Sequence, residues 1–258
     1  MKGDSQMMKT AAAVQRGTGH LAQGLPCQDR AVGRVGPSCA VVVLCDGAGS
    51  RADSHRAAQC LCDWASVWLA EAFDALYALD GPGAAARILR EGLARLDALE
   101  MEPDECLCTF LAFARHADGR WLMAHIGDGY IFASDEVLSH PENGRYANET
   151  YFFSEPRAAE HLRVAKGRDR TETAVLLTSD GCGDALYDRE ADRPVPAVRK
   201  LCLGLAAHTS EEARQALAYN LSEVFAARSD DDLSLALLWC PAPEPAAPDE
   251  YPERSGSE

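Results

Sequence analysis

Five apolar residues lead directly into an acidic turn in the segment Val41-Val42-Val43-Leu44-Cys45-Asp46-Gly47-Ala48-Gly49. A short, continuous apolar run bounded by a glycine-rich turn is typical of a fully buried strand, and we expect this strand to cover residues 39–45. The Asp46 carboxylate then lies where the strand stops, at the edge of a sheet. Such an edge can assemble side chains from distant parts of the chain.

Three further acidic clusters lie at the ends of apolar runs. Asp128 and Asp180 each follow a predicted strand, whereas Asp231 precedes one. Carboxylates, carbonyls and water are the ligands that Mg²⁺ and Mn²⁺ prefer, and glycine allows a backbone carbonyl or a substrate to come close. Two such ions a few ångströms apart can activate a bridging water and hold a phosphoryl oxygen, which favours hydrolysis of a phosphate ester. The clusters read Ile126-Gly127-Asp128-Gly129, Thr178-Ser179-Asp180-Gly181 and Asp230-Asp231-Asp232.

Each cluster also has an ordinary structural explanation. Asp-Gly is a common turn dipeptide, so Asp128 taken alone is more typical of a turn than of a ligand. Ser179 and Asp180 are residue types that begin helices. Residues 230–232 could form a solvated charged run. The spacing within each cluster does not decide between these interpretations.

The rest of the chain indicates a layered α+β architecture rather than a regular βαβ repeat. Gly81-Pro82-Gly83 is expected to break a long helix, and Thr209 with Glu212 forms a capping-box pattern. Residues 134–171 are polar and irregular, which predicts an insertion over one edge of a sheet. Expected strands are 106–115, 121–126, 130–133, 173–178 and 233–239; expected helices are 53–79, one carrying the apolar residues between Ile88 and Leu99, 195–207 and 210–226.

Composition excludes several classes of partner. The 258 residues carry a net charge of −15, which argues against nucleic-acid binding and against docking on anionic lipid. No apolar run reaches the roughly 20 residues of a membrane helix, and residues 1–10 do not resemble a signal peptide. Many of the ten cysteines lie in apolar runs, as reduced core cysteines do, so we expect a cytoplasmic protein. Residues 1–9 and the acidic, proline-rich segment 241–258 are expected to be disordered.

The residues of these motifs and their order along the chain resemble the protein phosphatase 2C family of metal-dependent serine/threonine phosphatases. The resemblance covers residues 10–240 and looks most like the bacterial branch that has Gln-Asp in its first motif. The motifs are Gly19-His20, Gly24-Leu25-Pro26-Cys27-Gln28-Asp29, Val43-Leu44-Cys45-Asp46-Gly47-Ala48-Gly49, Cys108-Thr109, His125-Ile126-Gly127-Asp128-Gly129, Leu177-Thr178-Ser179-Asp180-Gly181 and Asp231-Asp232-Leu233-Ser234.

This resemblance implies a four-layer αββα sandwich, two antiparallel sheets flanked by helix pairs, with residues 134–171 as a flap. It also implies hydrolysis of phosphoserine and phosphothreonine in proteins by direct attack of metal-bound water. The substrate would be a phosphoprotein, with a bacterial serine/threonine kinase or its target as a plausible partner.

The resemblance further implies a residue for each role. Asp46 would bridge two Mn²⁺ or Mg²⁺ ions, and the Gly47 carbonyl would bind one of them. Asp180 and Asp231 would complete the shell of the second ion. Asp128, together with Asp180, would match the ligands of a third, weaker ion. Asp29 would orient metal-bound water and, with Asp46 and Asp180, carry the catalysis.

Two positions depart from the family pattern. Gln28 stands where a metal-binding glutamate is usual, so an uncharged amide oxygen would hold that ion. Gly24 occupies the place of an arginine that often binds substrate phosphate, and Arg16, Arg30 or Arg51 could substitute for it. These departures favour an alternative, a pseudophosphatase that senses phosphate or binds a partner. The retained carboxylates favour the enzyme, because without a cation their repulsion costs stability.

Two histidines flank the predicted site in the sequence. His20 precedes the Gln28 motif, and His55 follows Asp46 in the first turn of a predicted helix. A histidine there could serve as the general acid for the leaving alcohol. A hydrogen-bonded structural histidine is the other interpretation, and the sequence leaves both open.

Overall fold

The computed structural model of the chain describes residues 7–142 and 150–243. The two segments expected to be disordered lie mostly outside these ranges, although the first strand begins at Lys9. Within the described residues, no helix has the length and apolarity that a membrane span requires.

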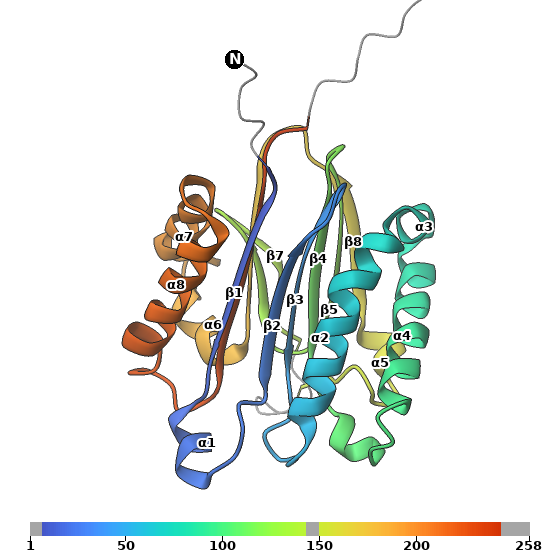
Figure 1. Ribbon diagram of the computed structural model, residues 1–258, viewed down its shortest axis with the longest axis vertical. Coiled ribbons are helices and arrows are strands. Elements are labelled where there is room, and N and C mark those ends of the chain that lie inside the picture. Colours follow the sequence, from blue (N-terminus) through green and yellow to red (C-terminus); the bar gives the residue numbers. More distant parts are fainter. Residues whose placement is uncertain (1–6, 143–149, 244–258) are drawn as a thin grey trace, which may run out of the picture.

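Two five-stranded antiparallel sheets form the centre of the molecule (Figure 1). The first sheet has the order β1 (Lys9–Gln15), β12 (Leu233–Cys240), β9 (Thr173–Thr178), β6 (Tyr130–Ala133) and β7 (Val137–Ser139). The second has the order β2 (Asp29–Val35), β3 (Cys39–Asp46), β4 (Phe110–His116), β5 (Arg120–Ile126) and β8 (Arg163–Arg168). The first and last strands of the chain are therefore neighbours.

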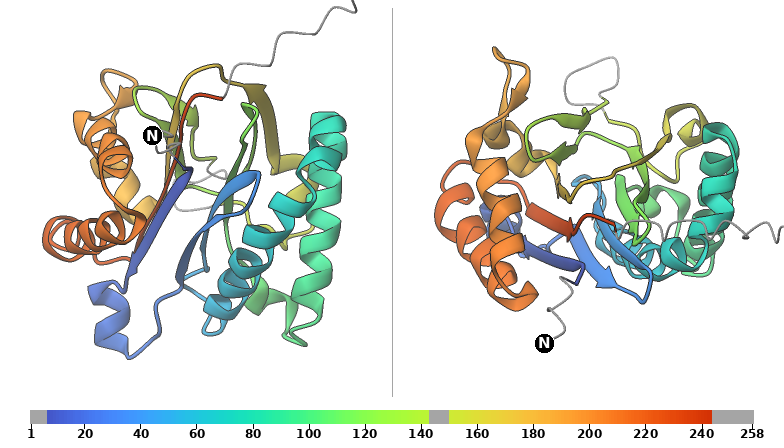
Figure 2. Two further views of the ribbon diagram at one scale, coloured as in Figure 1. Left: turned by 45° about the horizontal axis from the view of Figure 1, so that its top comes forward. Right: turned by 90° about the horizontal axis from the view of Figure 1, so that it is seen from above.

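Helices cover the outer face of each sheet, as Figures 1 and 2 show. The β2–β8 sheet is covered by α2 (Ser54–Glu71), α3 (Phe73–Ala78), α4 (Gly81–Asp97) and α5 (Ala158–His161). The β1–β7 sheet is covered by α6 (Asp180–Leu186), α7 (Pro196–Ala207) and α8 (Ser210–Asn220). The smaller elements are α1 (Thr18–Gln23), a 3₁₀ turn (Pro103–Cys106), a π-helical turn (Leu221–Phe225) and the hairpin β10 (Tyr187–Asp188) and β11 (Arg193–Pro194). The predicted four-layer αββα sandwich is confirmed.

Strand β3 shows how the sequence specifies these layers. Successive side chains of a strand point to opposite faces. Val41 and Val43 pack in the core beneath α2, whereas Val42 and Leu44 pack in the core between the two sheets. Because both faces are covered, a continuous apolar run is required, and this is the pattern that predicted the strand. A third core lies between the other sheet and helices α7 and α8.

The long helix expected over residues 53–79 is divided in two. Its first part ends at Glu71, Ala72 caps it, and α3 begins at Phe73. A helix does end next to Gly81-Pro82-Gly83, as predicted, since α3 stops at Ala78, and these three residues form the first turn of α4. Proline fits this position because the first turn needs no backbone donor there. The Asp80 side chain caps the turn by accepting a 2.8 Å hydrogen bond from the Gly83 backbone N–H.

The segment 134–171 is more ordered than predicted. Its first part forms β7 at the edge of one sheet, and its last part forms β8 at the edge of the other. The flap-like insertion therefore connects the two sheets, and residues 143–149 lie outside the described residues. The strand expected over residues 106–115 starts later, at Phe110, after a 3₁₀ turn. Strands β1 and β2 were not predicted.

Candidate metal centre

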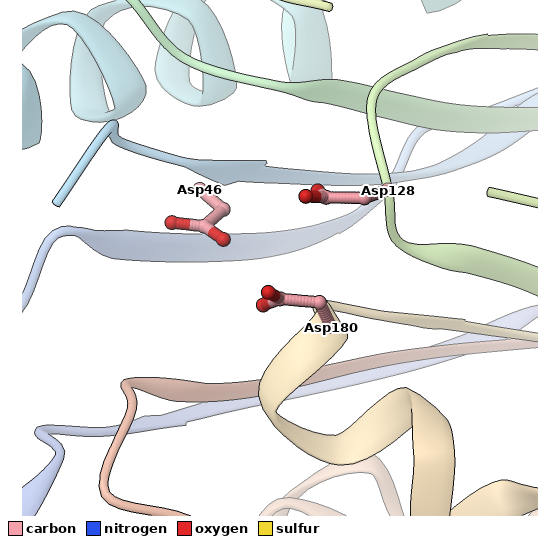
Figure 3. Close-up of side chains that lie close together, drawn as sticks. All are labelled: Asp46, Asp128 and Asp180. Carbon is pink, nitrogen blue, oxygen red and sulfur yellow. The ribbon is translucent and has the colours of Figure 1, made fainter. Parts of the chain in front are cut away.

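Three carboxylates meet at one end of the sandwich (Figure 3). Asp46 is the last residue of β3, Asp128 lies in the turn between β5 and β6, and Asp180 is the first residue of α6, directly after β9. One carboxylate oxygen from each lies within 4.8 Å of the others. Two sheets thus bring together three of the acids that the sequence placed at strand ends.

Close backbone approaches fix these carboxylates. Gly127 precedes Asp128 with a φ of 122°, and a β-carbon there would lie 2.5 Å from the Thr109 side chain, so only glycine is accommodated. Thr109 also holds Asp46, since its hydroxyl accepts the Asp46 backbone N–H at 2.9 Å and its own N–H donates to the Asp46 carbonyl at 2.8 Å. One threonine therefore sets the distance between two of the three acids.

The cluster is electrostatically unfavourable without a cation. Burial raises the pKa of Asp46 well above its usual range, and the charges of Asp29, Asp180, Asp128 and Asp231 raise it further. Desolvation by the surrounding protein raises the pKa of Asp180, and the negative charges of Asp128 and Asp231 raise it further, to about 7. Burial likewise raises the pKa of Asp128. The fold therefore holds like charges together, a feature common at functional sites.

Asp29 lies beside Asp46, its register partner across β2 and β3. Its pKa is raised to about 6, chiefly by burial and partly offset by the nearby Ser234 and Ser179 hydroxyls. Within the part of the chain that the structure describes, neither carboxylate oxygen has a hydrogen-bond partner. An acceptor of this kind suits the predicted orientation of a water bound at the site.

In the acidic run 230–232, Asp230 and Asp231 are exposed and Asp232 is buried, so the solvated-run interpretation does not hold for Asp232. Asp230 accepts a 2.8 Å hydrogen bond from the Thr18 hydroxyl. Asp231 lies close enough to the cluster for its charge to raise the pKa of Asp46, Asp128 and Asp180, although it is not one of the three acids whose oxygens lie within 4.8 Å. Asp232 is buried.

Asp232 has a structural function that the sequence analysis missed. Its carboxylate accepts hydrogen bonds from the backbone N–H groups of Gly17, at 2.6 Å, and Gln28. Its other contact is a 2.9 Å interaction with Nδ1 of His20. A signal was present, since Asp232 directly precedes a buried strand and one residue of a charged run there must face inward.

Gln28 is oriented toward the site by its hydrogen bonds. Its side-chain Nε2 donates to the Arg51 carbonyl, so Oε1 is the atom left without a partner among the described residues. Two of the three arginines that the sequence offered for phosphate binding contact other groups. Arg16 donates to the Leu25 carbonyl at 3.1 Å, and Arg30 lies 3.4 Å from Asp63 of α2.

The third arginine, Arg51, forms a 3.4 Å ion pair with Asp104. Gly47 follows Asp46, and its N–H donates to the Gln28 carbonyl at 3.1 Å. A β-carbon at Gly47 would lie 2.7 Å from the Ser54 hydroxyl, so this backbone packs directly against the start of α2.

These residues fit a divalent cation. Oxygens of Gln28, Asp29 and Asp128 are buried without partners within the described ranges, and buried polar atoms are rarely left unsatisfied. A cation would satisfy these oxygens and remove the carboxylate repulsion together. The donors are oxygens, as Mg²⁺ and Mn²⁺ require.

Comparison with known proteins shows the family of the chain. A family model described as protein phosphatase 2C matches residues 16–222. The chain belongs to the protein phosphatase 2C family. A curated relative, serine/threonine-protein phosphatase 3 of Escherichia coli strain K12, is 28% identical over 248 residues, which cover 86% of this chain and 95% of the relative. The predicted family is therefore confirmed.

Solved structures show the same fold at low sequence identity. A serine/threonine phosphatase of S. agalactiae has a TM-score of 0.59 and 14% identity, covering 90% of this chain and 98% of that one. The catalytic domain of the phosphatase PstP, solved with two manganese ions, has a TM-score of 0.55 and 18% identity, covering 90% and 97%. RsbX, solved with magnesium, has a TM-score of 0.54 and 12% identity, covering 92% and 96%.

Proposed function

We propose that this protein is a Mn²⁺- or Mg²⁺-dependent phosphatase that hydrolyses phosphoserine and phosphothreonine in proteins. The observation that carries the proposal is the convergence of Asp46, Asp128 and Asp180 within 4.8 Å, at the cost of raised carboxyl pKa values. Nothing in the packing of the sandwich requires these charges to meet. A phosphoprotein, such as a bacterial serine/threonine kinase or its target, would be the substrate.

Each residue of the site would have a distinct task. Asp46, which has one oxygen within 4.8 Å of both neighbouring acids, would bind two ions, and the Gly47 carbonyl and Gln28 Oε1 would bind one of them. Asp180 and Asp231 would bind the other, and Asp128 with Asp180 would hold a third, weaker ion. When bound, the ions would lower the pKa of water and stabilise charge on the phosphoryl oxygens. Asp29 would accept a hydrogen bond from the attacking water and orient it.

Two solved relatives support the choice of cofactor. PstP was solved with two manganese ions and RsbX with magnesium. Gln28 reduces the negative charge of the site by one relative to the glutamate of the family pattern. We therefore expect ion binding that is weaker than with glutamate but sufficient for turnover.

The deciding experiment measures phosphate release from a phosphothreonine peptide in millimolar Mn²⁺. We expect turnover that EDTA and Asp180→Asn each abolish. Asp184→Asn is a matched control, because Asp184 lies on the same helix but is exposed and pairs with Arg189 at 2.7 Å. Calorimetry should show Mn²⁺ binding to the wild type and weaker binding to Asp180→Asn. A folded protein that binds Mn²⁺ without turnover would contradict the proposal.

A further inference from the structure

The segment 17–28, which contains α1, is held against the start of β12 by the Asp232 carboxylate. The Asp232 side chain is 1% exposed and accepts hydrogen bonds from the backbone N–H groups of Gly17 and Gln28. The His20 ring, 12% exposed, places Nδ1 at 2.9 Å from the second oxygen of Asp232. Because an ionised carboxylate only accepts hydrogen bonds, Nδ1 is the ring nitrogen that carries hydrogen here. The Asp232 carboxylate thus fixes the orientation of the imidazole.

The other nitrogen of this ring lies near the turn that follows β3. A β-carbon placed on Gly49 would lie 3.9 Å from His20 Nε2 and 3.9 Å from Gln28 Oε1. Gly49 lies three residues after Asp46 in the turn that follows β3. His20 Nε2 and the Gln28 oxygen therefore lie next to the same turn, three residues from a carboxylate of the cluster. The His20 side chain is 12% exposed, so part of the ring is open to solvent.

The structure separates His20 from the second histidine that the sequence placed near the site. His55 lies in the first turn of α2. Its Nδ1 is buried without a partner, and no hydrogen bond among the described residues joins its ring to a carboxylate. An oriented imidazole paired with a carboxylate is the usual arrangement of a histidine that transfers protons. Of the two histidines that flank the site in the sequence, His20 has that arrangement and His55 does not.

We propose that His20 is a catalytic residue that protonates the leaving alcohol, an assignment that rests on the function proposed above. As the oxygen of water bonds to phosphorus, the bond from phosphorus to the serine or threonine oxygen breaks. That oxygen keeps the electron pair and takes the proton from His20 Nε2. The proton released by the attacking water restores the imidazolium, whose Nδ1–H stays on Asp232. The products are the free alcohol and hydrogen phosphate.

The test compares two esters that differ in their need for a proton. A threonine alkoxide must be protonated to leave, whereas p-nitrophenolate leaves without help. We expect His20→Ala and His20→Gln to lose about 10²- to 10⁴-fold in kcat on a phosphothreonine peptide in Mn²⁺, the usual contribution of a general acid. On p-nitrophenyl phosphate the same variants should lose less than about tenfold. A matched control is His208→Ala, since His208 is an exposed cap at the end of α7.

Equal losses on both esters, or no loss on either, would overturn the assignment while leaving the phosphatase intact. A wild-type protein that hydrolyses neither ester would overturn the proposed function and this assignment together.

A second readout needs neither metal nor turnover. Proton NMR of the metal-free protein should show a slowly exchanging, low-field imidazole N–H resonance from the Nδ1–H held by Asp232. It should disappear in His20→Ala and persist in His208→Ala. Its absence from the folded wild type would contradict the His20–Asp232 pairing on which the assignment depends.

Discussion

The same strands carry two buried polar clusters, one at each end, and the clusters are built on opposite rules. At one end, like charges meet and several oxygens have no partner. At the other, Arg115 is fully buried but donates to the Thr173 hydroxyl at 3.0 Å and to the His116 carbonyl. Asp169 lies 4.0 Å from this guanidinium and accepts the Thr173 hydroxyl at 2.7 Å. Opposite charges occupy this end, and two of the three guanidinium nitrogens have acceptors, whereas Nη2 has none among the described residues.

The cluster around Arg115 stabilises the fold. The carboxylate cluster costs stability, which the rest of the fold has to offset. Removing one partner of a buried pair of opposite charges is strongly destabilising, because the other charge is left uncompensated. Converging carboxylates are destabilising as they stand and become favourable when a cation binds. Substitutions at the two ends should therefore change stability in opposite directions, and only one end should change catalysis.

The largest effect is expected from Asp46→Asn. Bound ions contribute several kcal/mol of transition-state stabilisation, so kcat on a phosphothreonine peptide should fall by roughly 10³-fold or more. The Tm of the metal-free protein should rise, because a buried like charge is removed. Turnover assays and thermal melts in EDTA measure the two effects. A metal-free variant that melts earlier than the wild type would contradict the electrostatic interpretation of the cluster.

At the other end, Asp169→Ala should destabilise the protein by about 1–3 kcal/mol, because the Thr173 hydroxyl and the Trp121 indole lose their acceptor and Arg115 loses its countercharge. Its kcat should stay unchanged. Urea unfolding measures the first quantity and the peptide assay the second. Asp135→Ala serves as a control, since Asp135 forms only an exposed pair with Arg199 and such pairs contribute little. If Asp169→Ala lost as much kcat as Asp46→Asn, the distinction between the two clusters would not hold.

The pH dependence of stability should also come from the carboxylate end. Asp29 and Asp180 have pKa values raised to about 6 and about 7, against about 4 in an unfolded chain. Between these values the folded state binds more protons, so stability falls as pH rises from about 4 to about 7. Melts in EDTA should show the decline, and Mn²⁺ should flatten it, because ions bind the deprotonated groups. A Tm that rises over this range in EDTA would oppose this account.

The smallest effect is expected from Gln28→Glu. A carboxylate would attract the cation, but it would lose the hydrogen bond from Nε2 to the Arg51 carbonyl. A net gain of about 1 kcal/mol would tighten Mn²⁺ binding about fivefold. Calorimetry at fixed pH measures the change. Weaker binding by the glutamate variant would show that the Arg51 contact, rather than ligand charge, limits ion binding.

Buried strands were the part of the fold that sequence patterns predicted well. The segments 130–133 and 173–178 match β6 and β9 because continuous apolar runs end at acids or glycines. The Thr209–Glu212 capping box is confirmed at the start of α8. Strands β2 and β8 were missed because half-buried strands with arginine, lysine and glycine lack a clear alternation. The helix break at Ala72 has no glycine or proline to mark it.

The site was predictable only in outline. Acids at strand ends were visible in the sequence, but the spacing did not show that Asp46, Asp128 and Asp180 meet while Asp231 and Asp232 face different ways. That outcome depends on the register of β12 against β9. The partner of His20 is 212 residues away, beyond the reach of any local pattern. Sequence motifs identified the residue types, and the pairing of the sheets assigned their roles.

The pairing of β1 with β12 limits which contacts can form while the protein is being synthesised. Lys9 lies opposite Trp239. Strand β1 therefore leaves the ribosome early but cannot form its hydrogen bonds with β12 until β12 has been made. Asp231 and Asp232 arrive with that last strand. A nascent chain therefore cannot bring Asp231 to the carboxylate cluster or pair His20 with Asp232 until translation has reached this strand. These contacts form only after nearly all of the chain has been made.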